Sequence, residues 1–132
     1  MYITIPQKIY LDNSPVHGWG VFANQPISEN EIIEVCPIID MGLNFGDVSH
    51  ILIDYRFNWP QGTPNFEKQV ICSGYGMMYN HNENPNAAWR SNIENNTFEF
   101  YAVRPIRPQE EIFIWYGDIN YWNDGRNHTK VI

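Results

Sequence analysis

Short hydrophobic runs separated by turn-forming residues make up most of this chain, and helical periodicity is scarce. Runs of this length, bounded by Pro, Gly, Asn and Asp, predict β-strands. The longest, residues 31–39, contains Ile or Val at five positions. Strands are predicted over residues 8–11, 21–23, 31–39, 68–72, 75–79, 88–93, 97–103 and 112–115. The predicted fold class is therefore mostly β, built from many short strands.

Two regions add detail to this pattern. Residues 97–103 alternate in the way that a half-buried strand requires. The turn-forming residues Glu94-Asn95-Asn96 separate them from residues 88–93, which predicts a β-hairpin. Residues 47–57 are the exception, because apolar side chains recur there at helical spacing, so we expect one short helix.

Composition narrows the class of protein. The chain has 132 residues, enough for one domain. Its hydrophobic content of 43%, including 15% aromatics, is typical of a folded globule. The net charge of −7 argues against direct nucleic-acid binding, which requires a basic surface. A basic partner such as a lysine-rich peptide is compatible with it through long-range steering, although many acidic proteins are simply soluble.

The cysteines and the N-terminus restrict the setting. Cys36 and Cys72 lack the close spacing of a zinc site, so no metal is expected. Two free thiols in a reducing compartment are favoured over one disulfide, which stays open. Residues 1–10 carry no long apolar run and include Pro6, unlike a signal peptide. Since no stretch approaches the roughly 20 apolar residues of a membrane helix, we expect a soluble intracellular protein without a membrane partner.

Three segments carry candidate chemistry, and none is decisive alone. Gly18-Trp19-Gly20 permits close backbone approach or positive φ, but no helix follows it, so a dinucleotide site is excluded. His81 lacks the spaced partners of a metal site and the nucleophile motif of a triad, which favours a structural or ligand-contact role. Tyr116 follows an apolar strand, and a buried tyrosine with a satisfied hydroxyl is its simplest interpretation.

Taken in order, these segments resemble a known family. A Gly-aromatic-Gly turn at 18–20 is followed by Asn80-His81-x-x-x-Pro-Asn, and then by Glu110-Glu111-Ile-x-x-x-Tyr116-Gly-Asp. This pattern resembles the SET-domain protein lysine methyltransferases, especially the small stand-alone SET proteins of viruses and bacteria. The resemblance covers about residues 8–122, and Gly20-Val21-Phe22-Ala23 matches the first strand of that domain.

The resemblance implies a β-clip fold with at most one or two short helices. Residues 80–81 and the Tyr116 segment would pass each other in a knot-like crossing. We expect a single SET domain over residues 1–132, with a C-terminal tail at 123–132. The cysteines of pre-SET and zinc-binding post-SET regions are absent from the sequence.

The implied activity is methyl transfer from S-adenosylmethionine to the ε-amine of a protein lysine, leaving S-adenosylhomocysteine, without a metal. Tyr116 would orient the amine and favour the positive charge around the transferring methyl group. Tyr55 would take part at the same centre by lining the lysine channel with an aromatic wall. Ile114 would also line the channel, and its apolar side chain favours di- or trimethylation. The implied cofactor contacts are Gly18, Trp19, Gly20, Asn80, His81, Tyr121 and Trp122.

Partners and alternatives follow from the same resemblance. The substrate would be a basic lysine-containing protein or peptide such as a histone tail, in the host nucleus if the protein is viral. Monomer and homodimer stay open, as does a catalytically inactive SET-fold module that binds a peptide or partner. An unrelated acidic β protein is a third reading.

Tyr121-Trp122 could form an aromatic lid or a packed surface patch. The role of Asn82-Glu83-Asn84, in which Asn82 and Glu83 stand where the family pattern has Ser and Cys, stays open, as does that of residues 41–64.

Overall fold

The structure, a computed structural model, describes residues 2–40, 55–61 and 68–117. This part of the chain contains strands and no helix, which confirms the mostly β fold class. The strands are β1 Ile9–Asn13, β2 Trp19–Ala23, β3 Ile32–Asp40, β4 Phe57–Asn58, β5 Gln69–Cys72, β6 Asn80–His81, β7 Ala87–Asn92, β8 Thr97–Ala102 and β9 Glu111–Ile114.

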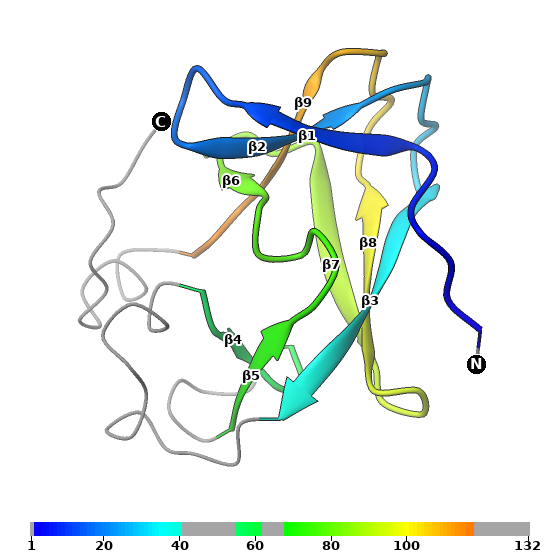
Figure 1. The fold of residues 1–132 in the computed structure, drawn as a ribbon, viewed down its shortest axis with the longest axis vertical. Helices are drawn as coiled ribbons and strands as arrows, with labels where there is room; N and C mark the ends of the chain where they lie inside the picture. Colours follow the sequence, from blue (N-terminus) through cyan, green and yellow to red (C-terminus); the bar gives the residue numbers. More distant parts are fainter. Residues whose placement is uncertain (1, 41–54, 62–67, 118–132) are drawn as a thin grey trace.

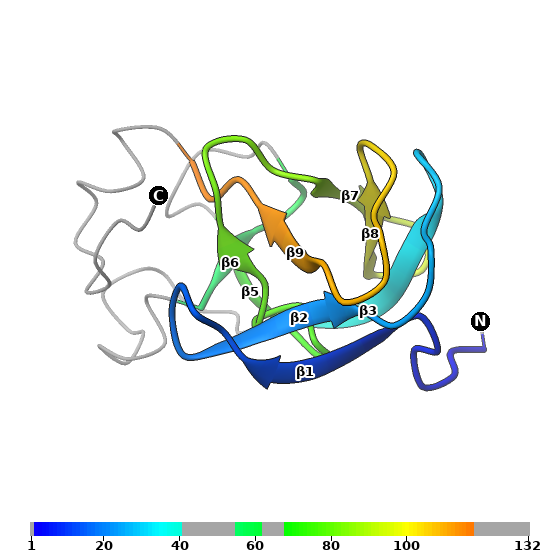
Figure 2. The same cartoon turned by 90° about the horizontal axis from the view of Figure 1, so that it is seen from above.

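The strands form two curled sheets (Figure 1). One has the order β1-β2-β9-β6 and the other the order β4-β5-β3-β8-β7. Every pairing between named strands is antiparallel except that of β6 with β9, which is parallel. Seen from above, β6 and β9 lie side by side next to β2 (Figure 2). A parallel pair needs a long connection, and here the β7–β8 hairpin lies between the two strands in sequence.

Local patterning explains the five-stranded sheet. The predicted hairpin is confirmed, with β7 and β8 paired from Ala87↔Ala102 to Asn92↔Thr97. Alternate residues of β8 point inward, so Phe98 and Phe100 are fully buried. Strand β3 pairs with β8 along most of its length and carries a bulge between Ile32 and Glu34. The strongly alternating segment of the sequence is thus the centre of the larger sheet.

Aromatic side chains fill much of the core next to this sheet. The ring of Tyr79 stacks on Phe100 with centroids 4.6 Å apart. Phe98 contacts Phe57 and Trp59 with centroids 5.3 and 5.2 Å away. Aromatic rings bury large areas, and such pairs add about 0.5–1.5 kcal/mol beyond burial. The high aromatic content of the chain is therefore explained largely by core packing.

One local prediction is wrong, and a second is wrong at its end. Residues 75–79 were expected to form a strand, but Met78 N donates to Tyr75 O at 2.9 Å in a turn, and β6 begins only at Asn80. The apolar side chains of this turn pack against the core, which explains why the segment resembles a strand in sequence. Of the predicted helix at 47–57, residues 47–54 lie outside the described residues. Its last residue, Phe57, belongs to β4 and pairs with Val70, so the helix does not extend that far.

Three further predictions concern the cysteines, a membrane helix and the C-terminal tail. Cys36 and Cys72 are both buried free thiols. No helix in this part of the chain has the length and apolarity needed to cross a membrane. The predicted C-terminal tail, residues 123–132, lies outside the described residues.

Candidate functional site

The parallel pair of β6 and β9 brings the two signature segments together. Asn80 and His81 pair with Phe113 and Ile114, and the ladder continues with Asn82 N donating to Ile114 O at 3.0 Å. Strand β9 then ends, and the next bond uses a side chain, because Tyr116 N donates to Nδ1 of His81 at 2.9 Å. The histidine ring therefore takes the place of a strand partner for the residue that carries the candidate hydroxyl. This is the side-by-side arrangement that the predicted crossing requires.

The hydroxyl of Tyr116 is directed by a second bond to the same segment. Its Oη donates to the carbonyl oxygen of Tyr79 at 2.6 Å. A tyrosine hydroxyl has one proton, so this oxygen can act only as an acceptor toward any further group. The Tyr116 ring also lies against the His81 ring, with centroids 5.3 Å apart and planes inclined by 52°. Both the backbone and the side chain of Tyr116 are thus held by residues 79–81.

Asn80 ties this pair of strands to the Gly-Trp-Gly turn. Its Nδ2 donates to the carbonyl oxygens of His17 and Trp19, each at 3.0 Å. The same Nδ2 lies 3.0 Å from Oε2 of Glu111, so its two protons are shared among three acceptors. Asn80 is 7% exposed, so these bonds are made in a largely dry environment where an unsatisfied amide is costly. The predicted cofactor residues at 18–20 and 80 are therefore neighbours in space.

Glu111 holds this junction together. Both of its carboxylate oxygens lie within bonding distance of the Ser14 hydroxyl, at 2.9 and 3.0 Å. A Cβ on Gly20 would lie 2.5 Å from Oε2 of Glu111, so only glycine permits this approach. Glu111 belongs to a signature segment, but the sequence alone predicts no role for it. The available signal was a charged residue entering an otherwise apolar strand; Glu111 is 8% exposed.

Gly18 has a different role from Gly20. Its φ is +49°, in the left-handed region that glycine adopts without penalty. A Cβ at Gly18 would meet no atom of the described residues within 4 Å. The turn therefore borders open space on this side. Trp19, between the two glycines, is 57% exposed.

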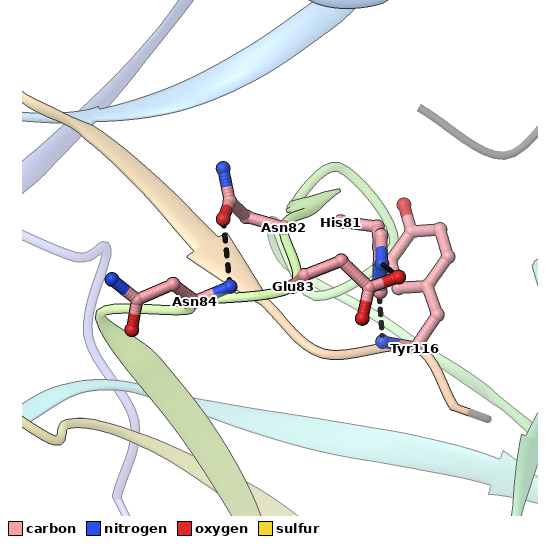
Figure 3. Close-up of polar contacts among 5 residues, drawn as sticks. All are labelled: His81, Asn82, Glu83, Asn84 and Tyr116. Carbon is pink, nitrogen blue, oxygen red and sulfur yellow. Dashed lines mark hydrogen bonds and ion pairs between the residues drawn. The ribbon is translucent and has the colours of Figure 1, made fainter. Parts of the chain in front are cut away.

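His81 is engaged at both ring nitrogens (Figure 3). Nε2 lies 3.3 Å from Oε1 of Glu83, and Nδ1 faces the amide of Tyr116. Because Nδ1 must accept from that amide, the partners assign the ring proton of the neutral imidazole to Nε2. The His81 side chain is almost completely buried. This environment favours a fixed structural contact over a general base.

A buried polar layer lies behind Tyr79. Its hydroxyl donates to Oε1 of Glu34 at 2.6 Å, and Tyr75 N donates to Oε2 at 3.3 Å. Burial raises the pKa of Glu34 despite these hydrogen bonds. Burial, and then the neighbouring carboxylate, raise the pKa of Tyr79 well above its ordinary value. The hydrogen bond with Cys72, followed by burial, raises the pKa of the Cys36 thiol, so neither the phenol nor this thiol is poised to react.

The remaining predicted site residues either make no side-chain hydrogen bond to this cluster among the described residues or lie outside them. Ile114 is 1% exposed and belongs to the core cluster at the end of β9. Tyr55 lies in the turn before β4, 40% exposed, and its channel role stays a prediction. Tyr121 and Trp122 lie outside the described residues. No group of three or more His, Cys, Asp or Glu side chains arranged to hold a metal ion occurs within the ranges that the structure describes.

Three comparisons relate this geometry to known proteins. Residues 18–117 match the family model of the SET domain. A Schizosaccharomyces pombe protein, the histone-lysine N-methyltransferase specific for H3 lysine-37, is 33% identical over 119 residues, covering 87% of this chain and 77% of that protein. The crystal structure of a Plasmodium falciparum protein assigned as a histone methyltransferase has a TM-score of 0.72 at 34% identity, covering 86% and 96% of the two chains.

A more distant structure shares the fold alone. One chain of an active polycomb repressive complex 2 in the basal state has a TM-score of 0.64 at 20% identity. The match covers 86% of the present chain but 16% of the longer one. The same arrangement of strands is therefore also found inside a much larger protein.

Proposed function

The chain belongs to the SET-domain family of protein-lysine methyltransferases, and from this premise we propose that it uses S-adenosylmethionine to methylate lysine in histones. The observation that carries the proposal is the double attachment of Tyr116 to residues 79–81. The hydroxyl directs its proton to Tyr79 O, which leaves lone-pair density for the reacting centre. A methyl group in transfer carries positive charge, and a fixed acceptor oxygen favours it.

The residues beside this hydroxyl fit the proposed cofactor. S-adenosylmethionine supplies a methyl group that is already activated on a sulfonium. Gly18 borders open space, and Trp19 offers an exposed aromatic surface next to it. The Asn80 amide group is spent on its own chain, and the described residues supply no donor to its oxygen. That oxygen is suited to accept from the ammonium group in the methionine part of S-adenosylmethionine. The His81 backbone is assigned to the adenine of the same cofactor.

The protein's contribution is orientation more than proton transfer. A lysine amine must be neutral to attack, and its ordinary pKa is about 10.4. The positive charge of the cofactor's sulfonium would lower the pKa of a lysine amine placed beside it. His81 is occupied at both ring nitrogens, so it supplies no base, and Tyr116 Oη would accept an N–H of the neutral amine and align it. Tyr55 and Ile114 are assigned to the lysine channel, and Tyr121 and Trp122 to a lid over the cofactor.

Histones are proposed as the substrate class on two grounds. The two relatives that share a third of their sequence with this chain are described as histone methyltransferases. The net charge of −7 favours encounter with a lysine-rich protein. The apolar side chain of Ile114 holds no water in the channel, which supports transfer beyond the first methyl group.

The test is methyl transfer from labelled S-adenosylmethionine to purified core histones, read by mass spectrometry. We expect Tyr116→Phe to lower kcat by about 10²-fold or more, the usual loss on removing a positioned polar group, while cofactor binding measured by calorimetry changes little. Tyr101→Phe, which removes a hydroxyl from β8, is the matched control. A folded wild type that neither binds the cofactor nor methylates any histone or lysate protein would overturn the proposal. Equal rates for wild type and Tyr116→Phe would remove Tyr116 from the mechanism.

A further inference from the structure

The segment Asn82-Glu83-Asn84 departs from the family pattern, and its Glu83 contacts the His81 ring that also bonds Tyr116 (Figure 3). Its two ends are fixed. Asn82 N is bonded to Ile114 O, and Oδ1 of Asn82 accepts from Asn84 N at 2.8 Å in a tight turn. Arg104 secures the following residues by donating to the carbonyl oxygen of Pro85 at 2.9 Å. Glu83 therefore sits on a supported turn, and its side chain bends back toward the buried His81 ring.

The bond between Glu83 and His81 is chemically selective. A carboxylate can only accept a hydrogen bond, so Oε1 of Glu83 requires the proton of His81 on Nε2. The Tyr116 amide can only donate, so it requires a bare lone pair on Nδ1. The two partners therefore demand the same tautomer from opposite sides of one ring. The partly exposed carboxylate reaches a ring whose side chain is 2% exposed.

We propose that Glu83 is a positioning residue that holds His81 in the tautomer that binds the Tyr116 amide. Tyr116 follows the end of β9, so this amide bond takes the place of a strand partner for its backbone. This amide bond and the bond from the hydroxyl to Tyr79 O hold Tyr116 at both its backbone and its side chain. When the amide bond is lost, only the hydroxyl bond of this pair remains. Small displacements of a reacting group lower the rate of group transfer strongly. This inference rests on the proposed function for its consequence in catalysis, but the tautomer itself is measured separately.

The first experiment reads the tautomer in the full chain. Long-range proton–nitrogen correlation spectra of protein labelled with nitrogen-15 in histidine show which ring nitrogen of His81 carries the proton. We expect the Nε2–H form in wild type. In Glu83→Ala only the Tyr116 amide still selects the tautomer, so we expect a mixture in which Nδ1–H is populated beside Nε2–H. Glu83→Gln should retain the wild-type form, because the amide oxygen still accepts. Glu94→Ala removes the same charge from the β7–β8 turn and should leave the spectrum unchanged.

The second experiment separates positioning from attraction of the substrate. In the histone assay we expect Glu83→Ala to lower kcat by about threefold to tenfold, with the KM for a histone peptide unchanged. Glu83→Gln and Glu94→Ala should stay within about twofold of wild type. A raised KM with constant kcat would mean that Glu83 only steers the basic substrate, which overturns the proposal.

The remaining outcomes are also decisive. A Glu83→Ala protein that keeps the wild-type tautomer overturns the proposal whatever its kcat, and so does one that changes tautomer without losing rate. A wild type with Nδ1–H overturns it at the first step. Should wild type prove unable to methylate any substrate, the proposed function fails, while the spectra still decide whether Glu83 sets the ring.

Discussion

The parallel pair of β6 and β9 with the residues that bond it, here called the crossing, and the five-stranded sheet are built from different interactions. In the sheet, Phe100 is fully buried between Tyr79 and Trp89, whose ring centroids lie 4.6 and 6.3 Å away. In the crossing, Ile112 and Ile114 of β9 also belong to the core, but buried polar side chains lie beside them. These bond to backbone groups that two short strands cannot pair by themselves. We therefore expect stability and the proposed chemistry to depend on largely separate residues, and substitutions should separate the two properties.

Asn86 shows how the crossing satisfies its backbone. Its Nδ2 donates to Glu111 O at 2.9 Å, and its Oδ1 accepts from Phe113 N at 2.8 Å. The side chain thus supplies a donor and an acceptor to one stretch of β9, as a neighbouring strand would. It is 1% exposed, and buried backbone groups are almost always paired. His81 does the same for the Tyr116 amide, so side chains replace a missing strand at two places.

The largest effect is expected in the sheet, where Phe100→Ala would leave a cavity next to Tyr79. Phe-to-Ala changes in cores cost about 3–5 kcal/mol, a large share of the roughly 5–15 kcal/mol of a typical domain. Denaturant titration should show a much lower midpoint. The fraction that stays folded in the cold should still bind S-adenosylmethionine with an affinity near that of wild type. A stable variant with weakened cofactor binding would show that the sheet and the crossing are not separable.

The same difference decides what the sequence predicts. The β7–β8 hairpin is predicted well, because alternation and a turn signal lie within a few residues of one another. Strand β6 has two residues and no pattern of its own, since its position is set by β9, some 30 residues later. The turn at 75–79 has the apolar residues of a strand without being one. Its side chains are apolar because they pack against the core in the folded chain.

The site divides in a similar way. The order of the signature segments predicts Asn80, His81 and Tyr116 as site residues, and the structure brings the three together. The roles of Glu111 and Glu83 could not be predicted, because each depends on a contact made only in the folded chain. Glu111 meets Ser14 across 97 positions. For Glu83, the sequence separation is short, but the contact has meaning only once the Tyr116 amide occupies the other side of the His81 ring.

An intermediate effect is expected at Glu111, where the crossing meets the Gly-Trp-Gly turn. Glu111→Gln keeps the shape but replaces one acceptor by a donor that faces other donors, Asn80 Nδ2 or the Ser14 hydroxyl. Hydrogen bonds to charged groups contribute about 1.5–3 kcal/mol, so we expect a stability loss of about 1–2 kcal/mol. Misplacing Asn80 should also weaken cofactor binding about tenfold, measured by calorimetry, since 1.4 kcal/mol corresponds to that factor.

Ser14→Ala is the matched control for this variant. It removes the hydroxyl that bonds the same carboxylate but leaves the bond from Asn80 in place. We expect it to lower stability by about 1 kcal/mol and to leave cofactor affinity within about twofold of wild type. Equal losses of affinity in both variants would show that Glu111 supports the turn in general and not Asn80 in particular.

The smallest effect is expected at Glu34, which links the two regions because it lies on β3 and bonds to the Tyr79 hydroxyl. Burial raises its pKa in the folded state above that of the unfolded chain. The folded state therefore binds a proton more readily, so the contribution of Glu34 to stability is fully present below the unfolded pKa. It is lost as pH rises through the raised folded pKa. Glu34→Gln keeps an acceptor for Tyr79 but cannot titrate.

Comparing the Tm of wild type and Glu34→Gln over a pH series isolates this one group. Wild type should gain relative to the variant as pH falls and lose relative to it toward neutral pH, by a few degrees at most. The opposite trend would mean that the bonds from Tyr79 and Tyr75 outweigh burial and favour the charged carboxylate. A charged Glu34 would then hold Tyr79, whose carbonyl oxygen accepts from the Tyr116 hydroxyl. The sheet would in that case position Tyr116 through this hydrogen-bonded chain as well as through packing.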